Sequence, residues 1–484
     1  MGCGILTTYP QIAAIVGVQG LIVYSVSSAL PIMLFAFAGP AIRRRCPDGF
    51  VLTEWVRHRF GLLTSLYLSF FTIITMFLYM VAELGAVQLA IESLTGLNAL
   101  PFLILECGVT TIYTSLGGFH TSFFTDNIQG IMVFLLLIVC SIAMGTQIHI
   151  DTSLIGPSGL LNGSQLGYQL IYILPVAIAT NDCFLAGFWL RTFASRSDRD
   201  LMIACAIATV IILIFLTLVG VTGLLAVWAN LLGDVVEDSA NSFFLVLLQL
   251  PAWVVGFVLV FTVALSTATF DSLQSAMASS ISNDIFHNRL PIIYVRIMVI
   301  LMMVPSIVVA LRAPNILQIY LISDLISAAV VPVLFLGLSK RFYFLTGWEV
   351  IISGLGGILS VFIFGTIFFG NALQGAQLIL LEEGLYVDDW SAFGAFVAAP
   401  VGGILFGVAT LVVRLLVLYI RSRVKGIPFT ALEKPTNLNE PFAATALPVQ
   451  TGESAEELIS PGKAVQKAVT KITTWRVGKN DDIE

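Results

Sequence analysis

Hydrophobic runs long enough to cross a bilayer follow one another along most of the first 420 residues of this chain. A membrane-spanning helix needs about 20 mostly apolar residues. After a short run that ends near Val16, such runs lie near residues 17–41, 61–92, 98–115, 125–148, 167–190, 200–229, 251–284, 292–311, 315–338, 347–370 and 391–420. We therefore expect an all-α polytopic membrane protein with about twelve apolar runs.

Composition supports this interpretation and excludes several classes of protein. Hydrophobic residues make up 58% of the chain and charged residues 11%, against roughly 45–50% and 25% in soluble domains. An ordinary soluble enzyme is excluded on this ground. The net charge of −6 provides no basic surface for nucleic acid, so that class of partner is excluded as well. The lipid bilayer is the partner that the composition predicts.

The chain divides into two parts. Residues 1–422 form the predicted transmembrane domain, and residues 423–484 form a polar tail interrupted by several prolines, which we expect to be largely disordered. Within the tail, residues 462–476 have the pattern of a basic amphipathic helix, because Lys463, Lys467 and Lys471 recur every four residues. A solvated short helix or coil explains this segment equally well.

The positions of lysine and arginine predict the orientation of the chain. One alternate set of loops carries nearly all of the basic residues, namely Arg43, Arg44, Arg45, Arg57, Arg59, Arg191, Arg196, Arg199, Arg289, Arg296, Lys340, Arg341, Arg421, Arg423 and Lys425. The other set carries only Arg312. Because basic loops stay in the cytosol, the tail is predicted to be cytoplasmic. The glycosylation motif at Asn162 then lies in an outer loop, and the plasma membrane is the expected location.

Six acidic residues lie in or at the edge of apolar runs that contain no basic residue: Glu83, Glu106, Asp126, Asp182, Asp271 and Asp324. Ionisable groups at membrane depth are costly and often functional. A carboxylate without a basic partner needs a cation, a proton or water. This pattern favours a protein that handles cations, although Glu106 and Asp182 could also lie in solvated vestibules.

Two further segments carry unusual side chains. The predicted helix over residues 261–284 is rich in serine and threonine, and Ser266, Thr269 and Ser272 follow one flank of it. Hydroxyl oxygens suit a desolvated alkali ion, but small residues also serve close helix packing. Between residues 113 and 129, Gly117 and Gly118 allow a tight turn before a new helix that starts near Asp126. That aspartate is explained equally well as a helix cap.

These segments resemble the sodium:solute symporter family. The family pattern Tyr-Thr-x-x-Gly-Gly followed by Thr-Asp-x-x-Gln is matched at residues 113–129, with Thr121 a mild departure, and the pattern ending in Asn-Asp-Ile is matched at residues 271–285. A further Trp-x-Arg segment starts at Trp189. Residues 94–98 and 327–334 look most like the family's eukaryotic urea and polyamine transporter branch. The resemblance implies a five-plus-five inverted repeat of the leucine-transporter type that works by alternating access.

The resemblance also implies a set of site residues. Its sodium site falls on Leu265, Ala268 and Thr269, and because Ala268 lacks the usual hydroxyl, Ser266 or Ser272 would have to replace it. The coupling ion is therefore expected to be sodium or a proton, and no other cofactor is implied. Asp126 matches a carboxylate on the cation's exit path. Glu83 and Asp271 are the expected carboxylates of the cavity.

The function implied is secondary symport of a small polar solute, with urea or a related amine as the best candidate, and not an enzymatic reaction. The sequence shows no paired catalytic residues, and it identifies no protein partner. Relative to the family, the first core helix is incomplete. Some 16 residues reach about 24 Å, against a hydrocarbon core of about 30 Å. We therefore expect the chain as written to lack coupled transport, and the alternative function is a truncated, uncoupled membrane receptor or scaffold.

The orientation can be tested by mapping the two sides of the membrane. We predict that an acceptor at Asn162 is glycosylated and that the tail after Arg421 is protected from protease in intact cells, because basic residues sort to one side. Glycosylation mapping and protease access on sealed vesicles measure this. Digestion of the tail from outside intact cells would show the opposite orientation.

Overall fold

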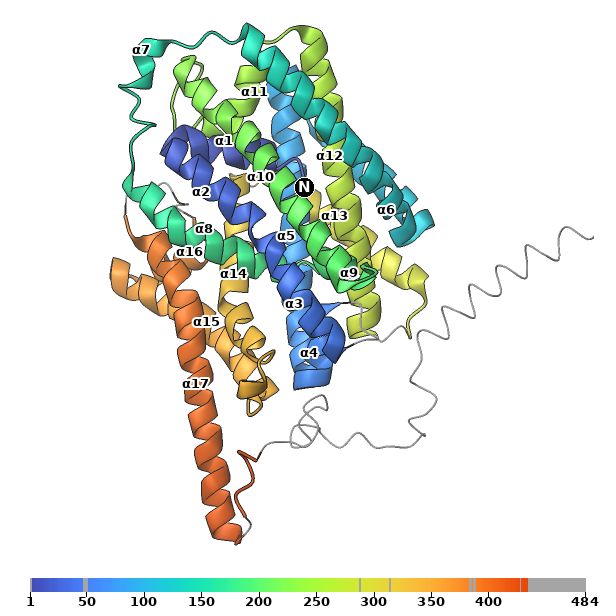
Figure 1. Cartoon of the computed structure of the whole chain (residues 1–484), viewed down its shortest axis with the longest axis vertical. Helices are drawn as coiled ribbons and strands as arrows, with labels where there is room; N and C mark the ends of the chain where they lie inside the picture. The colour runs from blue at the N-terminus through green and yellow to red at the C-terminus, as the bar shows by residue number, and fades with distance from the viewer. Residues whose placement is uncertain are drawn as a thin grey trace, which may run out of the picture.

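The computed structural model describes residues 2–46, 51–286, 289–312, 315–382, 385, 389–426 and 428–433, without the side chains of residues 113, 115–126 and 292. Every regular element in this part of the chain is a helix (Figure 1). The helices are α1 Ile5–Val16, α2 Val18–Ala29, α3 Pro31–Arg45, α4 Leu52–Phe60, α5 Leu62–Thr95, α6 Leu100–Gln147, α7 Thr152–Ile155, α8 Gln165–Phe184, α9 Ala186–Ala194, α10 Asp198–Trp228, η1 Ser239–Asn241, α11 Ser242–Leu247, α12 Ala252–Ser280, η2 Ile281–Ile285, α13 Ile292–Ala310, α14 Ile316–Leu336, η3 Lys340–Phe342, α15 Gly347–Phe369, α16 Ala372–Ile379 and α17 Ser391–Lys425.

The predicted all-α polytopic fold is confirmed. Among the described residues, nine helical segments are long and apolar enough to cross a membrane, and the bent pair α8 and α9 makes a tenth. Two shorter apolar helices cover Ile5–Val16 and Leu100–Ile112. The run predicted as one span over residues 167–190 is wrong in one respect, because it is broken into α8 and α9. The turn predicted at Gly117–Gly118 is wrong, because α6 is one continuous helix over Leu100–Gln147 that joins the runs predicted near residues 98–115 and 125–148; glycine permits a turn but does not require one. The amphipathic helix at residues 462–476 lies outside the described residues and stays a prediction.

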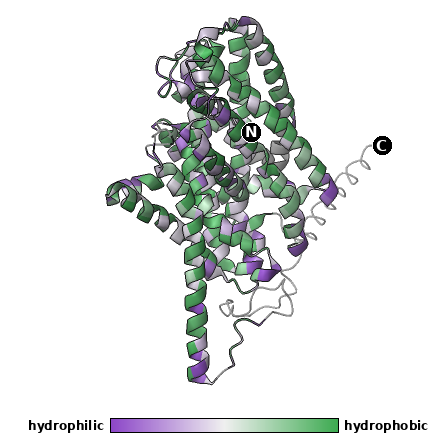
Figure 2. Cartoon of the chain, turned by 60° about the vertical axis from the view of Figure 1, so that its left-hand side comes forward, coloured by the Kyte–Doolittle hydropathy of each residue, from purple (hydrophilic) through white to green (hydrophobic). Residues whose placement is uncertain are grey.

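The helices turn their apolar side chains outward as well as inward. On α10, Ile203, Ile207, Val210 and Ile214 are about half exposed and follow one another at spacings of four and three residues. Such a stripe on a helix whose other face is packed is what contact with lipid requires. Figure 2 shows hydrophobic residues along the long helices and hydrophilic ones gathered near the ends of the molecule. The hydrophobic surface therefore agrees with an integral membrane protein.

The interior is organised around α5, α12 and α14. Helix α12 packs against α5 and α6, and α14 packs against α5, α8, α15 and α17. Helix α1 is almost entirely buried between α2 and α10. It ends at Gly17, whose φ of 80° favours glycine and whose Cα lies against the carbonyl of Leu160. This arrangement surrounds the start of the chain with helices from both halves of the sequence.

The basic loops gather at one end of the molecule. The C-terminal ends of α3 and α17, together with α4, lie at the lower end in Figure 1, opposite α7 and α11. Arg43 donates a hydrogen bond to the carbonyl of Ser195 (2.8 Å) and pairs with Asp198 (3.6 Å), which ties α3 to the start of α10. The structure therefore places the basic ends of separate helices side by side, as the predicted orientation requires.

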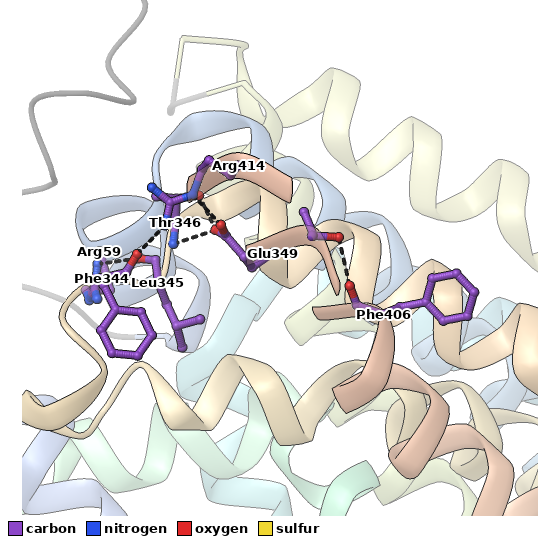
Figure 3. Close-up of polar contacts among 8 residues, drawn as sticks. Arg59, Phe344, Leu345, Thr346, Glu349, Phe406 and Arg414 are labelled. Atoms are coloured by element: carbon purple, nitrogen blue, oxygen red, sulfur yellow. Dashed lines mark hydrogen bonds and ion pairs between the residues drawn. The ribbon is translucent and has the colours of Figure 1, made fainter. Parts of the chain in front are cut away.

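A polar latch holds the segment between η3 and α15 at this same end (Figure 3). Glu349 is fully buried, and its carboxylate receives the guanidinium of Arg414 from α17 and the backbone N–H of Thr346 (2.8 Å). Arg414 also donates to the carbonyl of Phe344 (2.7 Å). From the other side, Arg59 of α4 donates to the carbonyls of Phe342 and Leu345. The latch joins α4, α15 and α17 through one loop.

Removing the arginine of the latch should destabilise the fold. We predict that Arg414→Leu lowers the free energy of unfolding by about 3 kcal/mol, because it leaves a buried carboxylate without its cation. The melting temperature of the purified protein in detergent measures this, with Arg423→Leu at an exposed position of the same helix as the control. Equal melting temperatures for both variants would contradict the role assigned to the pair.

Candidate functional site

A cavity of about 710 Å³ lies at the centre of the helix bundle. Its wall takes residues from the start of the chain and from α1, α2, α3, α5, α6, α8, α9, α10, α12 and α14. Most of the wall is apolar, with Met76, Ile178 and Phe215 among the lining side chains. The size and the mixture of apolar wall with few polar groups are typical of a small-molecule site.

The break between α8 and α9 forms one side of the cavity. The two helices meet at an angle of 61°, and Leu185, between them, is extended. Asp182, Leu185, Ala186 and Gly187 all line the cavity at this break. The end of α8 presents backbone carbonyls and the start of α9 presents N–H groups, so the break adds dipoles of both signs to the wall. Trp189 steadies it by donating to the carbonyl of Cys183 (2.8 Å).

Three carboxylates face this cavity from three different helices. Glu83 lies on α5, Asp182 on α8 and Asp324 on α14. Glu83 accepts hydrogen bonds from the Tyr320 hydroxyl (2.9 Å) and the backbone N–H of Cys3 (2.7 Å). Asp324 is buried close enough to Asp182 for the two charges to interact, and its Oδ1 atom has no hydrogen-bond partner within the described part of the chain. The cavity therefore gathers three acidic side chains in one wall.

Four tyrosines stand beside the carboxylates. Tyr9 and Tyr24 stack with their ring centroids 3.9 Å apart, and Tyr79 meets Tyr320 edge to face at 4.8 Å. All four line the cavity. The Tyr79 hydroxyl accepts a hydrogen bond from the Asn181 amide, which in turn accepts one from Ser323 (3.1 Å). The Asn181 contact fixes Tyr79 against α8, and the stacking of Tyr9 on Tyr24 covers one face of each of these two rings. Aromatic faces that remain toward the cavity suit a cation or methylene groups.

Some of the residues predicted to bind the coupling cation line the cavity, and others are buried outside its lining. Leu265, Ala268, Thr269 and Ser272 of α12 line the cavity, as does Glu83. Ser266 is fully buried outside the lining.

Asp271 is also buried outside the lining, where it accepts hydrogen bonds from Thr114 (3.2 Å) and Ser275 (3.4 Å). The side chain of Asp126 lies outside the described residues, so its role on an exit path stays a prediction. Asn162 is exposed in the loop before α8.

The tyrosines were missed by sequence reasoning, although a signal for two of them is present. Tyr79 precedes Glu83 by four residues, and Tyr320 precedes Asp324 by four residues. Residues four apart share one face of a helix, so each pair presents a ring and a carboxylate to the same space. Tyr9 and Tyr24 carry no such signal, because their partners come from other segments.

Residues 1–156 match the sodium:solute symporter family. The chain is 58% identical over 443 residues to the spermidine transporter DUR31 of Candida albicans, covering 90% of this chain and 85% of that protein. It is 31% identical over 127 residues to the probable urea active transporter 1 of Schizosaccharomyces pombe, covering 26% of this chain and 19% of that protein.

The fold has a solved counterpart. A structure of a sodium-coupled sialic acid symporter in a substrate-bound, outward-open state superposes with a TM-score of 0.62 and 15% sequence identity, covering 84% of this chain and 87% of that chain. At this identity the likeness concerns the fold, and it confirms the predicted leucine-transporter-type architecture. A broken helix beside a central cavity, together with a long match to a transporter of known family, leads to one conclusion: the chain belongs to the sodium:solute symporter family.

Proposed function

We propose that this secondary transporter carries a cationic amine of the linear polyamine class across the plasma membrane, coupled to sodium or protons. The observation that supports this proposal most is the set of three carboxylates and four tyrosines around one cavity. Among the described lining residues only Arg191 is basic, and it is an exposed residue of α9. Apart from Arg191, the described lining therefore offers no lysine or arginine side chain to compensate the three carboxylates.

Electrostatics favours a charged substrate over a neutral one. A desolvated carboxylate is costly without a partner, and a substrate ammonium group supplies that partner. The tyrosine faces add cation–π contact, and the apolar wall suits the methylene chain between two amines. Asp182 and Asp324, lying close together, would bind one ammonium group, while Glu83 on α5 would bind another.

The relatives support an amine and leave urea as the second candidate. The long match is to a protein named as a spermidine transporter, and the matches to urea transporters cover about a fifth of those proteins. Urea could donate hydrogen bonds to the same carboxylates but would leave their charge uncompensated. A membrane receptor remains the alternative to a transporter, and it would bind the amine without accumulating it.

The substrate proposal is tested with radiolabelled solutes in proteoliposomes. In place of the loss of coupled transport that the short first helix led us to expect, the acidic cavity leads us to predict gradient-driven accumulation of spermidine and not of urea. We also predict a rise of at least tenfold in the spermidine half-saturation for Asp324→Asn. Tenfold is about 1.4 kcal/mol, within the range for a charge-assisted hydrogen bond. The control is Glu92→Gln, which removes an exposed carboxylate from the end of α5.

Three outcomes would count against this account of the substrate. Urea accumulation without spermidine uptake would identify the other candidate. Binding of spermidine without any accumulation would indicate a receptor. An equal spermidine half-saturation in Asp324→Asn and Glu92→Gln would show that Asp324 does not contribute to substrate binding.

The coupling cation is proposed to bind at the cavity wall of α12. The carbonyl of Leu265 and the hydroxyls of Thr269 and Ser272 belong to cavity-lining residues of α12, and the side chain of Ala268 adds no oxygen. A sodium ion prefers several hard oxygen ligands, so this wall would hold sodium weakly. The family membership and the lining positions support this proposal.

Two substitutions on α12 test the coupling site. We predict that Thr269→Ala raises the half-saturating sodium concentration more than the solute half-saturation, because it deletes one oxygen ligand. Ala268→Ser should lower the sodium value by adding one. Solute uptake against sodium concentration measures both, and Thr267→Ala is the control, since that hydroxyl is bonded to the carbonyl of Val263 (2.8 Å). Unchanged sodium dependence in both test variants would assign these positions to packing.

A further inference from the structure

A small pocket lies at the basic end of the molecule, separate from the central cavity. Its wall is formed by the end of α3, by α4 and by the segment that follows α14. Arg45, Arg59 and Lys340 bring a permanent positive charge each, and His58 adds a ring N–H donor. None of the described residues that line this pocket is acidic. The pocket therefore gathers cations from three segments of the chain.

Two of these cations lack the partners that other arginines at this end have. Arg414 pairs with the buried carboxylate of Glu349. Within the described part of the chain, in contrast, no hydrogen bond or ion pair reaches the side chain of Arg45 or of Lys340. Both side chains are therefore free to contact a ligand.

The third cation, Arg59, is held in place by neutral groups. Its half-buried guanidinium donates to the carbonyls of Phe342 (3.1 Å) and Leu345 (3.2 Å), as Figure 3 shows for the latch. Burial lowers the pKa of Arg59, and the positive charge of Arg45 lowers it further. The two arginines thus lie close enough to repel each other, and an anion bound between them would turn that repulsion into attraction.

The donors and the size of the pocket indicate which anion fits. Guanidinium and ammonium groups are the usual donors to phosphate oxygens, and a phosphate monoester carries about −1.5 to −2 charges near neutral pH. Such a charge matches several cations better than a single carboxylate does. The pocket has a volume of about 30 Å³, which is room for roughly two water-sized groups. Phosphate oxygens can enter this space, while the rest of a ligand stays outside.

The position of the pocket favours a phosphate that belongs to a lipid. The membrane-crossing segment Val18–Arg45 ends in the pocket, and Gly337, which follows the crossing segment Ile316–Leu336, also lines it. Leu62 and Leu63, directly after α4, are 47% and 54% exposed, as expected for side chains that face lipid. Because spans leave the hydrocarbon at the level of the headgroups, lipid phosphates lie at this depth.

We propose that Arg45, Arg59 and Lys340 form a phosphate-binding site at the basic end of the protein, and that its ligand is the phosphate monoester of an anionic lipid headgroup. Free inorganic phosphate offers the same oxygens and is the other source of this chemistry. The site adjoins the start of the C-terminal tail, because Tyr343 of its wall donates its hydroxyl to the carbonyl of Leu432 (2.8 Å).

The site is tested by thermal stability, a measurement that requires no transport. The full chain is melted in nanodiscs of phosphatidylcholine, to which phosphatidic acid, phosphatidylserine of equal total charge, or inorganic phosphate in place of chloride is added at constant pH and ionic strength. A ligand of the folded state raises its stability. We therefore expect the melting temperature to rise saturably with phosphatidic acid, and to rise less with phosphatidylserine, which has no phosphate monoester.

Matched variants separate the pocket from the general charge of this end. Lys340→Gln and Arg45→Gln should each raise the half-saturating fraction of phosphatidic acid by about fivefold, because each removes one contact to the phosphate. The controls are Arg341→Gln and Arg44→Gln, which remove the same charge from neighbouring exposed positions outside the pocket and should leave that fraction unchanged. Arg59 is kept, since it also holds the latch.

Several results would overturn the proposal. One is a melting temperature that neither phosphatidic acid nor inorganic phosphate changes. Another is an equal effect of phosphatidylserine, and a third is an equal response of all four variants. A response to inorganic phosphate alone, weakened by Lys340→Gln and not by Arg341→Gln, would support a phosphate site and overturn its assignment to lipid. If Arg45→Gln does not fold, the comparison of Lys340→Gln with Arg341→Gln decides.

Discussion

The rest of this structure depends on one constraint, which is the cost of burying carboxylates inside a helix bundle whose outer surface faces lipid. Each must find a donor, a cation or water, because the hydrocarbon region offers none. Glu349 finds an arginine and thereby fixes the loop before α15. Glu83 finds a tyrosine and a backbone N–H and thereby draws α5, α14 and the start of the chain together. Asp324 keeps an oxygen atom without a partner among the described residues, and this is a position at which we place the ligand.

The same constraint distinguishes buried carboxylates that stabilise the fold from buried carboxylates that we propose to bind ligands. The latch among Arg59, Glu349 and Arg414 uses permanent cations of the chain, so it serves structure (Figure 3). Apart from the exposed Arg191, the described cavity lining holds no lysine or arginine side chain, and one of its carboxylates, Asp182, lies at the break between α8 and α9. A broken helix at the middle of a membrane bundle is tolerated where it lines a cavity. Charge and backbone geometry therefore point to the same site.

The sequence predicted the fold well because membrane spans are encoded locally. Length and hydropathy identify most spans to within a few residues, and the helix over Gly347–Phe369 was expected at 347–370. The break at Leu185 was not predicted, since Asn181 and Asp182 before it do not by themselves require a break and the proline of this run, Pro175, lies ten residues earlier. The acidic residues at membrane depth were predicted from their unfavourable location. The grouping of these residues was not predicted, because Glu83, Asp182 and Asp324 come from three helices that meet only through tertiary packing. The four tyrosines of the cavity were not predicted for the same reason.

The central claim is that the cavity carboxylates bind a cationic amine, and an experimental structure of the full chain in nanodiscs with spermidine tests it most directly. The account predicts density for an extended amine in the cavity. One nitrogen should lie about 3 Å from Asp182 or Asp324 and another near Glu83, which is hydrogen-bond distance. An empty cavity at saturating spermidine would contradict it. So would an amine bound only outside the cavity lined by Tyr9, Tyr24, Tyr79 and Tyr320.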